Sequence, residues 1–412
     1  MNIGILTYHC GPNFGCNLQA ISTIGYLKRM GHKPIVLHWY PEDLEKMYDR
    51  RIPLEQLQCH RDFVKNAMPI TRLCRTEEEL VGVINDSNLD AIIVGSDALF
   101  KYIPKACRTR FSFRQMKKVH IDPLSCEDLL DNPFWGGFVP KLKKRIPVAA
   151  FSVSSQNCPY QQMDTDEMDT IGGYMKNFSS ITVRDEWTSG MVKALTDFNN
   201  IPITPDPVFS FNQNCYLDIP SKEEIMEKFG LRDRYLLLSF SDWHIRESYI
   251  KSLADEINNK GYQPVALPMP EGLFDGGVAK KIHLPLSPLD WYALIRYSSG
   301  YIGERMHPIV VCLHNSVPFF CFDGYGTVSR YMCGVIRKFS INSSKTYLIL
   351  QRSGFTKQLF SYHGHVLMPS SKGVVESVLK FDKDKCSKFS DYYQKQYEKG
   401  MKLVLNSFNV SF

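Results

Sequence analysis

One short segment brings together three side chains that can bind anions or move protons. Gly303-Glu304-Arg305-Met306-His307-Pro308 lies between an apolar run and an apolar helical pattern. A proline is favourable at the first helical position, because its missing N–H would have no partner there. We therefore expect a strand that ends at Gly303, a helix that starts at Pro308, and His307 near the N-cap. An anion there would meet backbone N–H groups, the Arg305 guanidinium and the His307 imidazole; a capping histidine beside a surface arginine is the alternative.

A loop near the beginning of the chain is the second candidate. Its sequence, Asn13-Phe14-Gly15-Cys16-Asn17-Leu18-Gln19-Ala20, follows a short apolar run and opens a helical pattern. Asn17 is a suitable N-cap for a helix over 17–30. Asn13, Asn17 and Gln19 carry amides that suit sugar hydroxyls, so we take them as candidate acceptor-binding residues. The glycine spacing differs from G-x-G-x-x-G, which excludes a dinucleotide fingerprint, and an ordinary strand–helix turn is the alternative.

Two further candidates directly follow apolar runs that predict strands. Asp97 ends the segment Val94-Gly95-Ser96-Asp97, and Arg184 follows a similar run. Asp97 can act as a general acid or base or can hold an acceptor hydroxyl, and capping of the next turn is the alternative. Arg184 can point into a cleft and clamp an anion. The alternative for Arg184 is a weak surface ion pair with one of the two acids that follow it.

Cations gather in one stretch of the first half of the chain. Seven of them occur with no acid between them and with aromatic residues interleaved: Lys101, Lys105, Arg108, Arg110, Arg114, Lys117 and Lys118. Such a stretch can bind nucleic acid, an anionic membrane surface or the pyrophosphate of a lipid-linked sugar. A solvated basic face is the common alternative. Because the net charge is only +6, we expect no nucleic-acid partner.

The elements that must position these residues form an α/β pattern. Apolar runs without strict alternation are typical of parallel strands covered on both faces; they lie at 3–6, 34–38, 90–95, 148–153, 180–183, 235–240, 263–267, 300–303 and 317–322. Helical patterns lie at 17–30, 164–176, 245–258, 289–297, 308–315 and 387–406. Three prolines within 201–207 resist helix and central strand, which places a domain boundary there.

We therefore predict two Rossmann-like domains that face a cleft, residues 1–205 and 206–385, followed by a C-terminal helix within 386–412. In such sheets, ligands bind beyond the carboxyl ends of the strands. The candidate residues above all follow strands, so this fold would bring them to one cleft.

Composition excludes several classes of protein. Hydrophobic residues are 44% and aromatic residues 12% of the 412, enough for a large core, and no run is long and apolar enough to span a membrane. Twelve cysteines without a Cys-x-x-Cys pair fit reduced thiols in a cytosol, and no signal-peptide pattern opens the chain. We expect a cytoplasmic protein. His363-x-His365 is too sparse to predict a metal site, and no Walker A, His-Glu-x-x-His or Gly-x-Ser-x-Gly motif occurs, so we expect no metal and no cofactor.

The motifs together resemble the polysaccharide pyruvyl transferase family. The opening strand and its Asn13-Phe14-Gly15-Cys16-Asn17-Leu18-Gln19-Ala20 loop are similar to that family's Asn-Tyr-Gly-x-x-Leu-Gln-Ala loop. Three further matches follow in the family's order, at Gly95-Ser96-Asp97, Val183-Arg184-Asp185 and Asp206-Pro207. Arg305-Met306-His307 is similar to its Arg-Leu-His motif. One departure is that Ala98, Leu99 and Phe100 follow Asp97 where the family has a Gln and then a Trp.

The resemblance implies a GT-B-like fold and transfer of the pyruvyl group of phosphoenolpyruvate onto two sugar hydroxyls as a cyclic ketal, in surface polysaccharide synthesis. It implies that Arg305, His307 and Arg184 bind phosphoenolpyruvate in the second domain and that the first domain holds the acceptor, soluble or lipid-linked. A general acid and a general base are needed; His307 suits the acid, and Asp97 or Glu304 the base. A lipid-linked acceptor would bring the enzyme to the inner face of a membrane. A nucleotide-sugar glycosyltransferase on the same fold and a non-catalytic binding protein are the alternatives.

Overall fold

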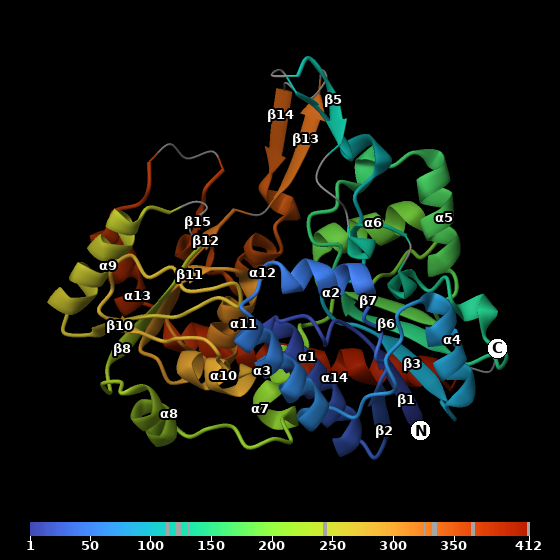
Figure 1. Cartoon of the computed structure of the whole chain (residues 1–412), viewed down its shortest axis with the longest axis horizontal. Coiled ribbons are helices and arrows are strands. Elements are labelled where there is room, and N and C mark those ends of the chain that lie inside the picture. The colour runs from blue at the N-terminus through green and yellow to red at the C-terminus, as the bar shows by residue number, and fades with distance from the viewer. Residues whose placement is uncertain are drawn as a thin grey trace.

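The computed structural model describes the whole chain except residues 113–114, 121–124, 131, 242–244, 325, 332–335, 364–366 and 410–412. It contains two parallel sheets, one built by the first half of the chain and one by the second (Figure 1). Helices surround both sheets and fill the space between them (Figure 1). The α/β class and the two Rossmann-like sheets that the sequence predicts are confirmed.

The first sheet has the order β2-β1-β3-β6-β7. Its strands are β2 (Lys33–Val36), β1 (Asn2–Leu6), β3 (Ala91–Val94), β6 (Val148–Val153) and β7 (Ser180–Val183). All neighbours in this sheet are parallel, and β3 and β6 are buried along their whole length. From β1 the chain first adds β2 on one side and then adds β3, β6 and β7 on the other, so the strand order reverses between β1 and β3. Open α/β sheets bind ligands at such a switch point.

The second sheet has the order β10-β9-β8-β11-β12-β15, which is the Rossmann order 3-2-1-4-5-6. Its strands are β10 (Lys280–Lys281), β9 (Gln263–Ala266), β8 (Tyr235–Ser239), β11 (Gly300–Glu304), β12 (Phe319–Asp323) and β15 (Leu359–Ser361). The switch point of this sheet lies between β8 and β11. The candidate segment 303–308 therefore starts at the carboxyl end of a switch-point strand.

The α-helices follow the strands as crossovers. In the first half they are α1 (Phe14–Arg29), α2 (Glu42–Asp49), α3 (Leu54–Ala67), α4 (Glu77–Asp86), α5 (Thr165–Met175) and α6 (Glu186–Leu195). In the second half they are α7 (Phe211–Asn214), α8 (Lys222–Phe229), α9 (Glu247–Asn259), α10 (Pro288–Arg296), α11 (Met306–Asn315), α12 (Lys345–Ser353), α13 (Ser371–Leu379) and α14 (Lys383–Ser407).

One hydrophobic core joins the two halves. Ile5 and Leu18 of the first half share a buried cluster with Val310 and Tyr397 of the second, and α1 packs against α10. The C-terminal helix α14 crosses this boundary: Ser390 near its start donates to the carbonyl of His314 at 2.8 Å, and Ser407 at its end lies 3.2 Å from Ser179 Oγ. In Figure 1 this helix passes from the second sheet back under the first. A ligand between the sheets is therefore held by a single packed framework.

Two antiparallel hairpins project from this framework, side by side in Figure 1. One consists of β4 (Thr109–Ser112) and β5 (Lys117–His120), and the other of β13 (Thr327–Tyr331) and β14 (Ile336–Ser340). The Asn157 amide donates to the carbonyl of Gly326 at 3.1 Å, which ties the base of the second hairpin to the first half of the chain. The sequence patterns predict neither hairpin.

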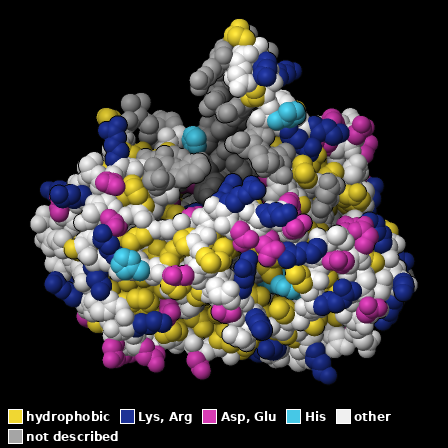
Figure 2. Space-filling view, viewed as in Figure 1, with side chains coloured by type: hydrophobic (Ala, Val, Ile, Leu, Met, Phe, Trp, Pro, Cys, Tyr) yellow, Lys and Arg dark blue, Asp and Glu magenta, His cyan; other side chains and the backbone are white. Residues whose placement is uncertain are grey.

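Charges of both signs are mixed over the face that Figure 2 shows, and Lys and Arg do not form one basic surface there. Two cations of the basic stretch pair with acids, Lys101 with Asp128 at 2.5 Å and Lys105 with Asp164 at 3.4 Å, and Arg108 donates to the Tyr102 hydroxyl at 3.0 Å. Lys117 and Lys118 on β5 are exposed. The side chain of Arg110, and Arg114 altogether, lie outside the described residues. Among the described residues, no helix is long and apolar enough to span a bilayer.

Candidate active site

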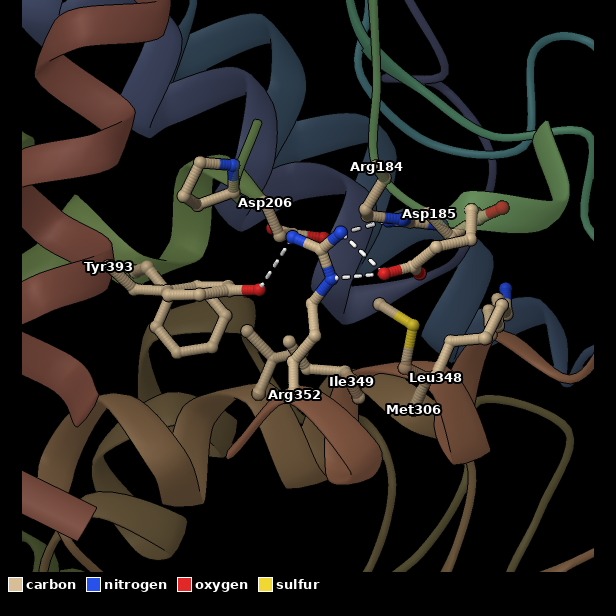
Figure 3. A pocket seen from close by; sticks show the side chains of 13 residues that line it. Arg184, Asp185, Asp206, Met306, Leu348, Ile349, Arg352 and Tyr393 are labelled. Carbon is tan, nitrogen blue, oxygen red and sulfur yellow. Dashed lines mark hydrogen bonds and ion pairs between the residues drawn. The ribbon is translucent and has the colours of Figure 1, made fainter. Parts of the chain in front are cut away.

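The segment between β11 and α11 differs from its predicted form at the helix start. The helix begins at Met306, two residues earlier than predicted, so that Pro308 is its third residue. Arg305 is the N-cap residue and has a φ of 73°, a left-handed conformation that costs a non-glycine residue free energy and is enriched at functional sites. His307 therefore belongs to the first helical turn. Met306 points to the opposite side, into a pocket near α12 and α14 (Figure 3).

His307 reaches across to the first domain and lies directly over Gly15, the second residue of α1. A Cβ atom at Gly15 would come within 2.1 Å of the imidazole Cγ, so only glycine leaves room for the ring. The imidazole Nε2 lies 4.0 Å from Oδ2 of Asp206 and is buried. Burial lowers the pKa of His307, although the carboxylates of Asp97 and Asp206 oppose the effect. In the unliganded protein, His307 is therefore neutral near pH 7.

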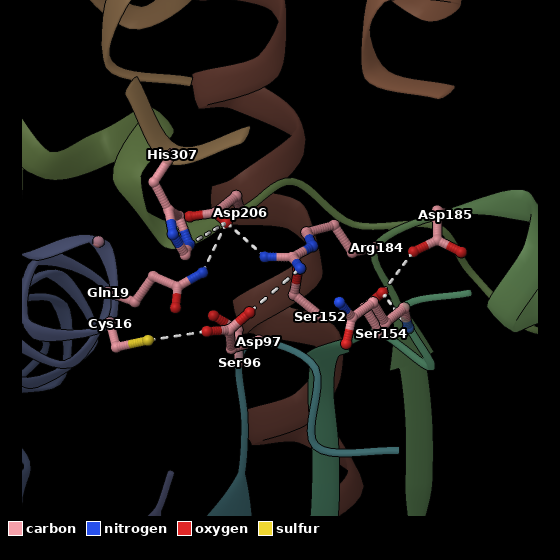
Figure 4. Close-up of polar contacts among 12 residues, drawn as sticks. Cys16, Gln19, Ser96, Asp97, Ser152, Ser154, Arg184, Asp185, Asp206 and His307 are labelled. Atoms are coloured by element: carbon pink, nitrogen blue, oxygen red, sulfur yellow. Dashed lines mark hydrogen bonds and ion pairs between the residues drawn. The ribbon is translucent and has the colours of Figure 1, made fainter. Parts of the chain in front are cut away.

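A buried polar network surrounds His307 (Figure 4). Arg184 donates from Nη1 to Asp206 at 2.7 Å and from Nη2 to Asp97 at 3.3 Å. The amide of Gln19 also donates to Asp206, at 2.6 Å, and the thiol of Cys16 donates to Asp97 at 2.8 Å. The candidates Asp97, Arg184 and Gln19 are thus brought together with His307; the first two follow strands and Gln19 lies in the second turn of α1.

The network rules out the alternative that the sequence left open for Arg184. Arg184 is buried and bridges Asp97 and Asp206, so it is not a surface partner of Asp185 or Glu186. The Asp185 carboxylate instead accepts from the backbone N–H of Thr188 and caps α6. Nε of Arg184 is buried without a hydrogen-bond partner, which leaves one donor of the guanidinium for a ligand.

Electrostatics hold Asp97 in its ionised form. Burial alone would raise the pKa of this carboxyl group, but three cations outweigh burial and hold the pKa well below the ordinary value: His307, which is protonated in the acid range where Asp97 would titrate, Lys345 and Arg184. Lys345, the first residue of α12, is half-buried, and loss of contact with water lowers the pKa of its ammonium group while Asp97 opposes this. Lys345 and Asp206 belong to the same charged group, and the sequence patterns point to neither as a site residue.

Two pockets flank the start of α11. The first is lined by the loop residues Asn13, Phe14 and Gly15 on one side and by Trp291, Arg305 and His307 on the other. The Arg305 guanidinium at its rim pairs with Glu271 at 2.7 Å and is about one third exposed. The second pocket, seen in Figure 3, is lined by Arg184, Asp206, Met306, Lys345, Arg352 and Tyr393. His307 lines the first pocket, and its Nε2 lies 4.0 Å from Oδ2 of Asp206, which lines the second.

Glu304 lies at the end of β11 and lines the first pocket together with His307. One carboxylate oxygen accepts from the backbone N–H and the hydroxyl of Ser241, at 2.9 and 2.6 Å, and the other accepts from the hydroxyl of Tyr362 at 2.9 Å. These bonds occupy both oxygens and hold neighbouring loops at the carboxyl edge of the sheet. Of the two candidate bases, Asp97 is therefore the one within the His307 network, and a catalytic role for Glu304 stays a prediction.

The three candidate acceptor residues have different surroundings. Asn13, and not Asn17, is the N-cap of α1: its Oδ1 accepts from the backbone N–H groups of Gly15 and Cys16 at 3.0 and 3.4 Å. Asn17 is buried inside the helix and donates to the carbonyl of His9 at 2.9 Å. Gln19 holds Asp206. Asn13 lines the first pocket, so of the three residues it is the one that a ligand in this pocket can contact.

Comparison with models of protein families identifies the family of this chain. The family model of the polysaccharide pyruvyl transferases matches residues 13–324. The chain belongs to the polysaccharide pyruvyl transferase family. The matched range contains the first loop, Asp97, Arg184, Asp206 and the Arg305–His307 segment. A search of curated proteins finds no match.

Solved structures share the fold of this pyruvyl transferase family member. A UDP-GlcNAc 2-epimerase from Methanocaldococcus jannaschii has a TM-score of 0.55 and 12% identity, with 98% of this chain and 100% of that chain covered. LpCGTa in complex with UDP has a TM-score of 0.53 and 10% identity, with 100% and 99% covered. A putative UDP-N-acetylglucosamine 2-epimerase from Listeria monocytogenes has a TM-score of 0.50 and 10% identity, with 100% and 98% covered. At such low identity the likeness establishes the GT-B-like fold and nothing more.

Family membership indicates a transferase that acts in polysaccharide formation. The motif segments that carry the match are also those that meet at His307 in space. Lys345 lies beyond the matched range, although it belongs to the same buried charged group. No local pattern marks it, because a lysine that starts a helix is ordinary on a protein surface.

Proposed function

We propose that this protein transfers the pyruvyl group of phosphoenolpyruvate onto two hydroxyls of one sugar and forms a cyclic ketal. The observation that carries the proposal is the position of His307, which stands at a helix start between Arg305 and the ionised Asp97. Family membership supports the transfer of a pyruvyl group. The donor, the ketal chemistry and the acceptor are inferences from the site.

The site suits a small donor with two anionic groups. Phosphoenolpyruvate carries a phosphate and a carboxylate, and the start of α11 offers backbone N–H groups and a positive dipole end. Arg305 can form a bidentate contact with one anionic group, once its guanidinium leaves Glu271. The buried Nε of Arg184 and the ammonium of Lys345 lie on the other side of His307. We assign the donor to the pocket between the first loop and the α11 start.

The donor's charge would change the protonation of His307. Burial keeps the imidazole neutral in the free protein, because it lowers the pKa. An anionic donor within contact distance would raise that pKa, since an opposite charge favours the protonated form. His307 would then take up a proton with the donor and be ready to give it to the methylene carbon as a general acid.

The ketal forms in two additions whose atoms balance. Protonation of the methylene carbon makes an oxocarbenium-like centre at the adjacent carbon, and a first sugar hydroxyl attacks it while a base accepts the hydroxyl proton. Inorganic phosphate then leaves, and the second hydroxyl closes the ring. One hydroxyl proton ends on the new methyl group and the other on phosphate. Asp97, ionised and 3.3 Å from Arg184, is our candidate for the base.

The acceptor lies, in this proposal, against the first domain. Asn13 faces the pocket, while Asn17 and Gln19 hold the loop and Asp206 in place. We propose a sugar acceptor, soluble or lipid-linked. The exposed Lys117 and Lys118 on the β4–β5 hairpin are the described cations with which the chain would contact an anionic lipid surface.

The reaction itself can be tested with purified protein, phosphoenolpyruvate and a panel of soluble and lipid-linked oligosaccharides. We expect acceptor-dependent release of phosphate and a product heavier than the acceptor by pyruvate minus water. A protein that instead transfers sugar from a UDP- or GDP-sugar would be a glycosyltransferase on this fold. A protein that binds phosphoenolpyruvate and turns over no acceptor in the panel would support the binding-protein alternative.

A further inference from the structure

Three potential metal ligands converge beside the first loop, outside the network around His307. They are His9 and Cys10, in the loop that follows β1, and His38, just after β2. His9 Nε2 lies 2.8 Å from Nδ1 of His38, and Sγ of Cys10 lies 3.2 Å from the same Nδ1. All three ligand atoms lie within 4.8 Å of one another, a spacing from which one ion could touch all three.

The protonation of His9 is set by its second ring nitrogen. Nδ1 lies 2.9 Å from the carbonyl oxygen of Thr7, which can only accept, so Nδ1 carries the proton and the lone pair of Nε2 accepts from Nδ1–H of His38 at 2.8 Å. A histidine that binds metal usually donates its other N–H to a carbonyl in this way, which orients the ring. Metal binds the neutral imidazole, and this is the form in which His9 and His38 would coordinate.

The backbone around these residues is fixed by hydrogen bonds. The carbonyl of His9 accepts from Asn17 Nδ2 at 2.9 Å, and the hydroxyl of Thr7 donates to the carbonyl of Ser96 at 3.1 Å. The backbone N–H of His38 donates to the Thr71 hydroxyl at 2.9 Å. The cluster is therefore held before any ion arrives, and such second contacts strengthen a metal site.

We propose that His9, Cys10 and His38 bind one transition-metal ion of the Zn²⁺ class. Two imidazoles and one thiolate are the ligand types that Zn²⁺ takes, at about 2.0–2.1 Å to nitrogen and about 2.3 Å to sulfur. The separations of His38 Nδ1 from His9 Nε2 and from Cys10 Sγ are slightly shorter than those around a tetrahedral ion, so His38 would move away from both by a few tenths of an ångström. Cys10 and His38 are half-buried, which gives the ion a path from solvent and leaves a fourth position for water or a ligand.

Metal binding must release a proton, because the thiolate and not the thiol is the ligand. The nearby Arg75 is paired with Glu45 at 2.6 Å, so this pair adds little net charge against a cation. The proton that His38 shares with His9 moves to the other nitrogen of the His38 ring, and the thiol proton leaves to solvent. An ion here would stiffen the loop that leads to Asn13, beside the proposed acceptor side.

The test is Co²⁺ and Zn²⁺ binding by the full, tag-free chain after removal of metal with a chelator. We expect one equivalent of Zn²⁺ by mass spectrometry of the metal content. With Co²⁺ we expect a near-ultraviolet thiolate charge-transfer band and the strong visible bands of a tetrahedral site. Cys10→Ser should remove the charge-transfer band, and His38→Gln should weaken binding at least tenfold. Cys59→Ser, at another half-buried thiol, is the matched control and should bind like wild type.

Circular dichroism melts without metal check that each variant is folded. A wild-type chain that holds no metal at micromolar free Zn²⁺ would overturn the proposal. So would a Cys10→Ser variant that keeps the charge-transfer band, or a Cys59→Ser variant that loses it. None of these outcomes depends on phosphoenolpyruvate, so the metal site and the proposed function fail separately.

Discussion

The His307 imidazole packs against the bare Cα of Gly15, with 2.1 Å between the ring Cγ and the place where a Cβ would stand. This contact joins the start of α11 in the second domain to the start of α1 in the first. It also fixes the ring between Asp206 and the pocket that we assign to the donor. The position of His307, the candidate acid, thus depends on a glycine, Gly15, in the other half of the chain.

Gly15→Ala should therefore displace His307 without weakening the fold. Alanine is favoured over glycine inside a helix by about 1 kcal/mol, so α1 itself should not be destabilised by the change. We expect the rate of pyruvyl transfer to fall at least tenfold while the melting temperature changes by a few degrees at most. Gly173→Ala in α5 is the control, because nothing lies within 4 Å of its new methyl group. Equal activity of both variants would show that the ring position is unimportant.

A second prediction concerns proton uptake at His307. Because burial lowers the imidazole pKa in the free protein and an anionic donor would raise it, donor binding should take up a proton near pH 7. Affinity should then fall as pH rises through the window between the two values. Calorimetry of phosphoenolpyruvate binding in buffers of different ionisation enthalpy measures the uptake. His307→Gln should lack this uptake and lose turnover, and identical proton counts for the variant and wild type would exclude the linkage.

The Arg184 bridge between Asp97 and Asp206 should matter for stability as well as for catalysis. Removal of one partner from a buried ionic group costs about 3–5 kcal/mol, because the remaining charges are left unpaired. We expect Arg184→Met to lower the free energy of unfolding in urea by that amount. Arg184→Lys should cost less, but should weaken phosphoenolpyruvate binding because lysine cannot bridge Asp97 and Asp206 in the same way and has no counterpart of the unpartnered Nε. Arg50→Met, at an exposed arginine, should stay within about 0.5 kcal/mol of wild type, and a similar loss in both methionine variants would contradict the assignment.

How far the sequence predicts this molecule depends on the range of the interactions. The apolar runs locate β3, β6 and β11 correctly because a buried strand is a local pattern. The start of α11 is displaced by two residues because the left-handed conformation of Arg305 has no sequence signature. Asp206 belongs to a motif but receives no role, and Lys345 belongs to none, because only the folded chain brings them to His307. The ligands of the proposed metal site are missed likewise, since His38 is 28 residues from Cys10.

Acid should destabilise the fold through buried neutral histidines. His314 accepts from the backbone N–H of Asn212 at 3.3 Å, and burial together with Arg296 lowers its pKa to about 3. A pKa that is lower in the folded state gives stability that is complete above about pH 6.5 and is lost as pH falls towards 3. Each pH unit in this window should cost about 1.4 kcal/mol for this group. Urea unfolding at several pH values measures how the free energy of unfolding depends on pH. This dependence should be less steep for His314→Gln than for the wild type, and an equal dependence would show that His314 does not contribute to it.

Attachment to an anionic membrane can be tested at the β4–β5 hairpin. Lys117→Glu with Lys118→Glu should reduce co-sedimentation with anionic liposomes at low salt, because each cation near such a surface contributes about 1 kcal/mol. Lys399→Glu with Lys402→Glu on α14 makes the same charge change elsewhere and should have less effect. Sedimentation that is insensitive to salt, or equal in the two variants, would mean that the hairpin is only a solvated basic surface.

The claim at the centre of this account is that phosphoenolpyruvate binds at Arg305 and His307. Isothermal titration of the wild-type chain, Arg305→Lys and Lys399→Glu with phosphoenolpyruvate, and of the wild type with UDP-GlcNAc, tests it most directly. We predict that the wild type and Lys399→Glu bind phosphoenolpyruvate alike, that Arg305→Lys binds it at least tenfold more weakly, and that UDP-GlcNAc does not bind. Binding of UDP-GlcNAc in preference to phosphoenolpyruvate, or equal affinity of Arg305→Lys and wild type for phosphoenolpyruvate, would contradict the claim.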